Sequence, residues 1–147
     1  MLLVETSNQY SVVAKNTTDN ISTVVFNQTT IEFDSGATRN LDHAGPAEIL
    51  CSSFAACCLK NVSRFKEMLH LNIDYAEIEV TAMREEKPPR IVEINYLLKV
   101  KTTEDEKKLA LLQKNLEQFG TIFNTLKLAC PINGKIIKIG IEQNEKQ

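Results

Sequence analysis

The segment PAEILCSSFAACCLKNVSRFKEML, residues 46–69, predicts one long helix with an apolar side that needs a sheet to cover it. Pro46 suits a first helical turn, and Glu48 is well placed for the positive end of the helix dipole. A helix of this length extends about 36 Å. Its apolar and small residues recur at a spacing of three and four, which predicts a stripe that packs on a sheet. The stripe consists of Cys51, Phe54, Ala55, Cys58, Val62, Phe65 and Leu69.

The segments before this helix have the composition of strands. Residues 10–14, 22–26 and 29–33 are rich in β-branched and aromatic side chains. Residues 27–28, Asn-Gln, suit the tight turn of a hairpin between the last two. Residues 34–45 collect Asp, Ser, Gly, Asn and His, which is the composition of a loop. We therefore expect three strands and a loop before the helix.

Two more strands and a second helix are expected after it. Residues 76–82 and 94–100 alternate between apolar and polar, which predicts two half-buried strands joined by a turn at residues 85–89. Residues 103–106, Thr-Glu-Asp-Glu, have the pattern of a capping box and should begin the second helix. The apolar face predicted for that helix consists of Leu109, Leu112, Leu116 and Phe119. Residues 135–141 predict a closing strand.

The predicted order of elements is β-β-β-α-β-β-α-(α)-β. This order indicates an α+β fold, in which helices pack against a mainly antiparallel sheet. The chain has 147 residues, and we find no linker or internal repeat in it. We therefore expect a single domain over residues 1–147.

The composition argues against several classes of protein. Hydrophobic residues make up 43% and charged residues 24%, as in ordinary globular domains. The net charge is −2 and no basic patch is evident, so we expect no binding to nucleic acid. Residues 1–5 lack the pattern of a signal peptide, and no apolar run approaches the roughly 18 residues that span a bilayer. We expect a cytoplasmic protein that does not bind membranes.

The four cysteines have different expected environments. Cys51 and Cys58 fall inside the apolar stripe of the helix, so we expect both to be small core residues. Cys57 points about a quarter-turn away, to a side of the helix that also carries Ser53, Lys60, Asn61 and Arg64. The two cations there would favour a thiolate, which makes Cys57 a candidate for chemistry. The alternative is an idle cysteine at the boundary of the core.

Metal binding and disulfides are constrained by the same spacing. The sequence has no CxxC motif, and neither His43 nor His70 is spaced as a metal ligand with the cysteines, so we expect no metal and no cofactor. A bridge between Cys57 and Cys58 would strain the helix, and two turns separate Cys51 from Cys58. Any disulfide within this chain must therefore involve Cys130.

Two separate motifs resemble those of the OsmC/Ohr family, the osmotically inducible and organic hydroperoxide resistance proteins. GPAEILCSSFAAC, residues 45–57, is similar to the family's GP-x-E-L-L helix with its later A-x-x-C, and ACPIN, residues 129–133, is similar to its CP-[VI]-[SN] segment. With the matching order of strands and helices, the resemblance covers nearly the whole chain. It implies an OsmC-like fold with a long central helix that carries a cysteine. It also implies an intertwined homodimer with active sites at the subunit interface.

The resemblance also implies thiol-dependent peroxidase chemistry on organic hydroperoxides. Cys57 matches the position of the peroxidatic cysteine, which becomes a sulfenic acid, and Cys130 matches the resolving cysteine, which condenses with it to a disulfide. An external dithiol would then reduce the bridge. The alternatives are an OsmC-like dimer that senses redox state or binds a small apolar ligand without turnover, and a structural dimer with idle thiols.

The charged residues of this chain depart from the hydroperoxidase pattern. Those proteins carry an early arginine that helps to activate the thiolate, whereas no arginine precedes Arg39 here. Their glutamate lies ten residues before the reactive cysteine, where this chain has Ala47, and Glu48 matches instead a PxEL version of the motif. On a straight helix Glu48 and Cys57 would be about 13 Å apart on opposite faces. Glu48 is therefore either a catalytic residue, through an irregular first turn or the partner subunit, or a helix N-terminal charge.

We expect the missing positive charge to come from another residue. The candidates are Arg39, in the loop before the helix, and the pair Lys60 and Arg64 on the helix itself. The catalytic residues predicted from the sequence are therefore Cys57, Cys130, Glu48 and Arg39.

Overall fold

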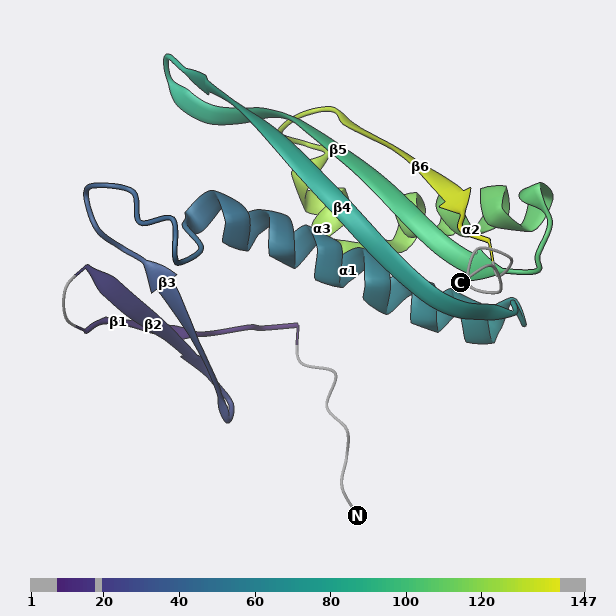
Figure 1. Ribbon diagram of the computed structural model, residues 1–147, viewed down its shortest axis with the longest axis horizontal. Coiled ribbons are helices and arrows are strands. Elements are labelled where there is room, and N and C mark those ends of the chain that lie inside the picture. The colour runs from purple at the N-terminus through teal and green to yellow at the C-terminus, as the bar shows by residue number, and fades with distance from the viewer. Residues whose placement is uncertain (1–7, 18–19, 141–147) are drawn as a thin grey trace. The chain divides into compact units, whose positions relative to one another are not determined.

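The computed structural model describes residues 8–17 and 20–140 of the chain (Figure 1). Its order of elements is β1-β2-β3-α1-β4-β5-α2-α3-β6, which confirms the predicted order and the α+β class. The chain divides into two compact units, Met1–Ile49 and Leu50–Gln147, and each is described by itself below. The predictions for residues 1–5 and for Ile141 lie outside the described residues.

The first unit contains an antiparallel sheet of β1 (Val13–Asn16), β2 (Ile21–Phe26) and β3 (Thr29–Asp34). Phe26 pairs with Thr29 across the predicted two-residue turn, where Asn27 takes a positive φ of 53°. This confirms the hairpin. The first strand begins at Val13, three residues later than predicted, because Val13 pairs with Val25, close to the end of β2, and earlier residues have little of that strand left to pair with.

The second unit contains the larger sheet, with β4 (Ile73–Glu86), β5 (Pro89–Thr102) and β6 (Ile132–Lys138) in that spatial order. β4 and β5 are antiparallel, and Glu86 pairs with Pro89, so the turn predicted at residues 85–89 is shortened to residues 87–88. β6 is parallel to β5. The predicted closing strand begins three residues too late, because its pairing with β5 starts at Ile132.

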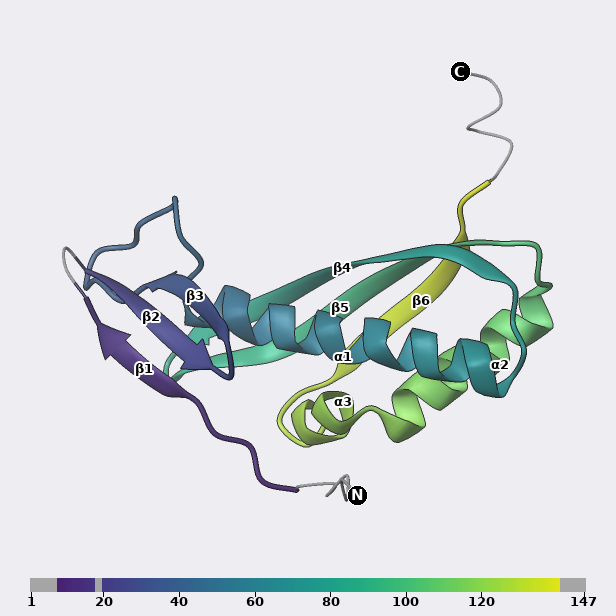
Figure 2. The same ribbon diagram turned by 90° about the horizontal axis from the view of Figure 1, so that it is seen from below.

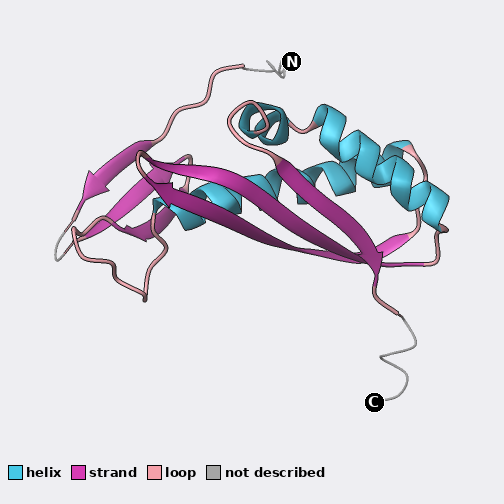
Figure 3. Ribbon diagram, turned by 90° about the horizontal axis from the view of Figure 1, so that it is seen from above, coloured by secondary structure: helices cyan, strands magenta, loops and turns pink. Residues whose placement is uncertain are grey.

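Helices cover one face of this sheet (Figures 2 and 3). They are α1 (Pro46–Met68), which enters this unit at Leu50, α2 (Glu106–Phe119) and α3 (Thr121–Leu126). Four stripe residues of α1, the predicted inner face of β5 and three leucines of α2 are buried together. They are Phe54, Cys58, Val62, Phe65, Ile94, Tyr96, Leu98, Val100, Leu109, Leu112 and Leu116. Phe119 was predicted on the buried face but is 47% exposed, because it is the last residue of its helix.

α1 ends in a Schellman motif. His70 takes a positive φ of 52°, its N–H donates to the carbonyl of Glu67 (3.3 Å), and the N–H of Leu71 donates to the carbonyl of Lys66 (2.9 Å). Leu71 is buried, as the residue after such a turn often is. The helix therefore ends one residue before the predicted Leu69, and the backbone conformation of His70 terminates it.

The predicted capping box at residues 103–106 is wrong in its detail. The N-cap of α2 is Asp105, whose carboxylate accepts from the N–H of Lys108 (2.9 Å). The two residues before it bind Asn72, which directly precedes β4: the hydroxyl of Thr103 accepts from the side-chain amide of Asn72 (2.9 Å), and Glu104 accepts from the Asn72 N–H (2.6 Å). The hydrogen bonds of Thr103 and Glu104 to Asn72 therefore take the place of the predicted capping interactions.

Tyr96 lies at the centre of the sheet and depends on a glycine in the next strand. It pairs with Gly134 of β6, and a Cβ at Gly134 would overlap the Tyr96 ring. The missing side chain lets the ring lie directly on the backbone of β6, where it packs against Phe54 and Phe123 at centroid distances of 5.9 and 6.3 Å. This aromatic cluster fixes the middle of α1 on the sheet.

Candidate active site around Cys57

Cys57 lies in the middle of α1 and is half-buried. One turn later on the same helix is Asn61, whose Nδ2 lies 3.1 Å from the Cys57 carbonyl oxygen and 3.7 Å from its Sγ. A side-chain amide carries two hydrogens on this nitrogen, so it can donate to both atoms. The Cys57 sulfur therefore has a hydrogen-bond donor beside it.

The junction between α2 and α3 also lies close to this sulfur. This junction is Gly120, which is buried and caps both helices. A Cβ on Gly120 would lie 3.3 Å from the Cys57 Sγ, so the sulfur is close to a stretch of bare backbone. The candidate site is thus formed by α1 and the α2–α3 junction.

The neighbouring Cys58 has a very different environment. It is 3% exposed, and burial, together with the nearby Cys57 and Glu117, raises the pKa of its thiol to about 12. At neutral pH it is a neutral thiol and a poor nucleophile. This confirms the predicted core position of Cys58. Cys51, predicted in the core as well, is only partly buried.

Cys130 lies between α3 and β6 and is 8% exposed. Its N–H donates to the carbonyl of Leu126 (3.2 Å), and the carbonyl of Pro131 accepts from Ile94 of β5 (3.0 Å). The Cys-Pro motif is thus held by its backbone between a helix and the sheet. Cys130 belongs to the same hydrophobic cluster as Cys58, and Cys57, Cys58 and Cys130 are all free thiols.

A partly buried polar network lies next to Cys58 and was not predicted from the sequence. The Tyr96 hydroxyl donates to Glu117 (2.9 Å) and accepts from Gln113 (3.1 Å), which also donates to the Gly134 carbonyl (2.8 Å). Burial raises the pKa of the Tyr96 phenol, which keeps it a neutral donor. Gln113 and Glu117 also line a shallow depression of about 450 Å³ on the surface of α2.

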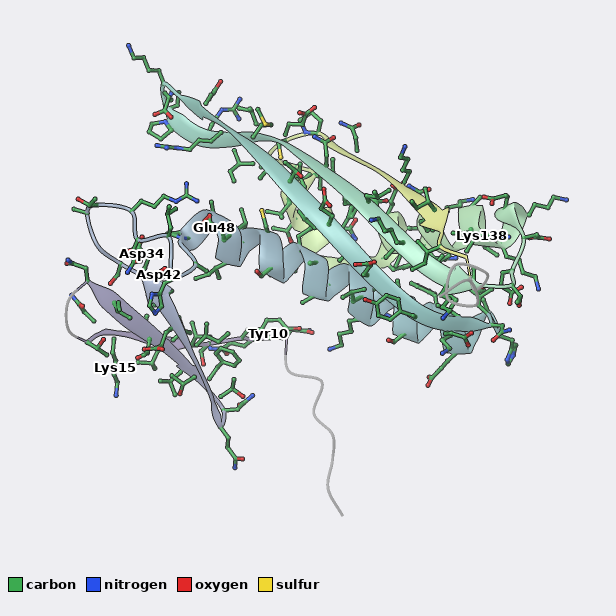
Figure 4. The ribbon with its side chains drawn as sticks, viewed as in Figure 1. Tyr10, Lys15, Asp34, Asp42, Glu48 and Lys138 are labelled. Carbon is green, nitrogen blue, oxygen red and sulfur yellow. The ribbon has the colours of Figure 1, made fainter. Side chains whose placement is uncertain are left out.

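Arg39 and Glu48, both in the first unit, form an ion pair (Nη2–Oε1 3.5 Å). Both side chains are largely exposed, at 70% and 47%, so the pair is open to solvent. The same Glu48 oxygen accepts from the N–H of Gly45 (3.1 Å), the residue whose carbonyl accepts the first hydrogen bond of α1. Glu48 therefore has a clear role at the helix N-terminus, the second of the two predicted roles (Figure 4).

The loop that carries Arg39 is held by Asp34 at the end of β3. Its carboxylate accepts from the N–H groups of Asn40 (2.9 Å) and Gly36 (3.0 Å), and these hydrogen bonds lower the pKa of Asp34. The N–H of Asp34 in turn donates to the carbonyl of Ala44 (2.8 Å), which closes the loop. The position of Arg39 within the first unit is thus fixed by its own loop.

The other two predicted cations lie on α1. Lys60 and Arg64 are exposed, and the Arg64 guanidinium lies 5.5 Å from the centroid of the Phe65 ring. That ring packs on Phe119 at 5.8 Å. A cation–π contact of this kind keeps the Arg64 guanidinium beside the Phe65 ring.

Within residues 8–17 and 20–140, no three His, Cys, Asp or Glu side chains cluster as they would around a metal ion. Of the helices in the part of the chain that the structure describes, none combines the length and apolarity needed to cross a membrane.

Comparison with solved structures identifies the fold. The structure is similar to an OsmC-like protein from Mycoplasma pneumoniae, with a TM-score of 0.82 and 20% identity over 90% of this chain and 98% of that one. It is also similar to the organic hydroperoxide resistance protein OhrB of Bacillus subtilis, with a TM-score of 0.65 and 13% identity over 87% and 98%. An organic hydroperoxide resistance protein OsmC from Legionella pneumophila matches with a TM-score of 0.64 and 12% identity over 88% and 98%.

A search of curated proteins finds no match. The family model of the OsmC-like proteins matches residues 39–135, which include the long helix, the second helix and the Cys-Pro motif. The match covers well over half of the chain, and the chain therefore belongs to the OsmC-like protein family.

Proposed function

We propose that this protein is a thiol-dependent peroxidase that reduces organic hydroperoxides, with Cys57 as the attacking and Cys130 as the resolving cysteine. The observation that carries the proposal is the contrast between adjacent thiols. Cys57 is half-buried with an amide donor at its sulfur, whereas Cys58 is buried and its pKa is raised to about 12. Family membership, and the two hydroperoxide resistance proteins among similar structures, support the substrate class.

The reaction begins at the Cys57 thiolate. The sulfur donates an electron pair to the outer oxygen of the hydroperoxide, an S–O bond forms and the O–O bond breaks. The sulfur loses two electrons and becomes a sulfenic acid, and the peroxide leaves as an alkoxide that takes a proton from solvent to give the alcohol. The Cys130 thiol then attacks the sulfenic sulfur, which releases water and forms the disulfide. An external dithiol reduces this bridge and is itself oxidised to a disulfide.

We propose that the peroxidase works as an intertwined homodimer with its active sites at the interface, in the cytoplasm. The resemblance to the OsmC/Ohr family is the basis of this proposal. Several large apolar side chains of the second unit are exposed, as surfaces that bind a partner often are. Examples are Met68 (59% exposed), Tyr75 (52%) and Leu128 (87%).

The central test follows the disulfide and the turnover together. The reduced protein is treated with tert-butyl hydroperoxide, its disulfides are mapped by mass spectrometry, and hydroperoxide consumption is followed with dithiothreitol present. We expect a Cys57–Cys130 bridge and sustained turnover. In Cys130→Ser we expect one equivalent of hydroperoxide to be consumed when no reductant is present, with a sulfenic acid left on Cys57.

The outcomes separate the possible functions. A bridge without turnover would favour the redox sensor among the alternatives. An unreactive Cys57 with no bridge would contradict both redox functions and leave an apolar ligand or a structural role.

The source of positive charge for the Cys57 thiolate is a separate proposal. We propose that Arg39, which forms an ion pair with Glu48, or Lys60 and Arg64 supply it. The variants Arg39→Ala, Lys60→Ala and Arg64→Ala are compared by the pH dependence of Cys57 alkylation. Loss of the responsible cation should raise the midpoint by about one pH unit. If none of the three moves the midpoint, no cation of this set activates the thiol.

A further inference from the structure

Asn61 is an unusual residue for its position in α1. Its side chain is 8% exposed, in the middle of a long helix. Asparagine is a poor helix former, because its amide competes with the backbone for hydrogen bonds, and burying an amide is unfavourable unless it is hydrogen-bonded. Leucine is a better helix former than asparagine and buries no polar group, so it would favour the helix more at this position. Asn61 is placed instead to contact Cys57. Its Nδ2 lies within hydrogen-bond distance of both the carbonyl oxygen and the sulfur of that cysteine.

Gly120 is unusual for a different reason. Its backbone angles, φ −74° and ψ 120°, are open to any residue, so the conformation of the chain does not require glycine. The space around it is restrictive, because a Cβ would lie 3.0 Å from both the Leu116 carbonyl and the Phe123 Cβ, and 3.3 Å from the Cys57 sulfur. The absent side chain therefore lets the α2–α3 junction lie close to the sulfur.

We propose that Asn61 is a positioning residue for the Cys57 sulfur, which also lies close to the bare backbone of Gly120. This inference rests on the peroxidase function proposed above and adds one residue to it. The Asn61 amide donates to the thiolate before the reaction and to the sulfenic oxygen after it. A hydrogen bond to a charged sulfur is stronger than one to a neutral thiol, so the amide favours the reactive form. No proton is transferred to or from the amide.

The test compares Asn61→Leu with a matched control. Asn115 on α2 makes the same kind of hydrogen bond, from its Nδ2 to the Leu111 carbonyl one turn back (2.9 Å), but has no cysteine at its side. In Asn61→Leu we expect the rate constant of Cys57 with tert-butyl hydroperoxide to fall about 10- to 100-fold. The midpoint pH of Cys57 alkylation by iodoacetamide, read at that residue by mass spectrometry, should rise. Asn115→Leu should change neither value, and Asn61→Gln, which keeps the amide, should recover part of the rate.

Two readouts keep this inference separate from the peroxidase function. If wild-type Cys57 does not react with hydroperoxide but Asn61→Leu still raises the alkylation midpoint, the peroxidase function fails and the role of Asn61 stands. If the wild type turns over and Asn61→Leu keeps both its rate and its midpoint, the role of Asn61 is refuted. A fall in rate of equal size in Asn115→Leu would also refute it, because the effect would then be one of helix packing.

Discussion

Replacement of Cys57 by serine should abolish hydroperoxide consumption, with a loss of about 1,000-fold or more, because the variant lacks the attacking sulfur. A serine hydroxyl is not ionised near neutral pH and does not attack the O–O bond. The environment of Cys57 should hardly change, since the oxygen replaces the sulfur of a half-buried side chain whose neighbour is an amide donor. The measurement is the steady-state consumption of tert-butyl hydroperoxide with dithiothreitol as reductant.

Cys58→Ala is the control for this experiment. It removes the adjacent thiol, whose raised pKa of about 12 makes it unreactive at neutral pH. We expect the control to keep most of the wild-type rate, with some loss of stability because Cys58 is buried. If Cys58→Ala were inactive and Cys57→Ser active, our choice between the two cysteines would be wrong.

Replacement of Phe54 by alanine should have the largest effect on stability, a loss of about 3–5 kcal/mol in the free energy of unfolding. Phe54 is fully buried, and its ring packs against Tyr96 of β5 at 5.9 Å and Phe123 of α3 at 5.6 Å. Truncation leaves a cavity between three elements that cannot easily close, since Tyr96 is also held by its hydroxyl. Urea unfolding, followed by circular dichroism, measures the change.

Phe119→Ala is the matched control for Phe54. It removes the same ring from a side chain that is 47% exposed and contacts the Phe65 ring at 5.8 Å. We expect a loss of about 1 kcal/mol. Equal losses in the two variants would contradict the central position that we assign to Phe54.

The parts of the fold that follow from periodicity could be predicted from the sequence. The stripe of α1 and the alternation of β5 each report which side faces the core, and the structure buries Phe54, Cys58, Leu98 and Val100 accordingly. The ends of elements could not be predicted as well. Asp105 replaced Thr103 as the cap of α2, because Thr103 and Glu104 bind Asn72, a partner far away in the sequence.

The residues of the candidate site could likewise be predicted only in part. Helical phase separated Cys57 from Cys58, because burial of a residue on a helix depends on its angle around the axis. Asn61 was visible as a polar neighbour at a spacing of four, although its burial was not. Gly120 gave no signal, because its proximity to Cys57 arises only from the packing of the α2–α3 junction on α1.

The parallel pairing of β6 with β5 has a consequence for the order in which this protein folds. β4 and β5 are joined by a turn of two residues, whereas residues 103–131, which include α2 and α3, separate β5 from β6 along the chain. Closing the longer loop costs about 2 kcal/mol more in chain entropy, so we expect the β4–β5 hairpin to form early and β6 to join late. Cys130 directly precedes β6, so its thiol becomes buried in this late step. A partly folded or nascent chain would then expose Cys130 to oxidants, and only the completed fold would protect it.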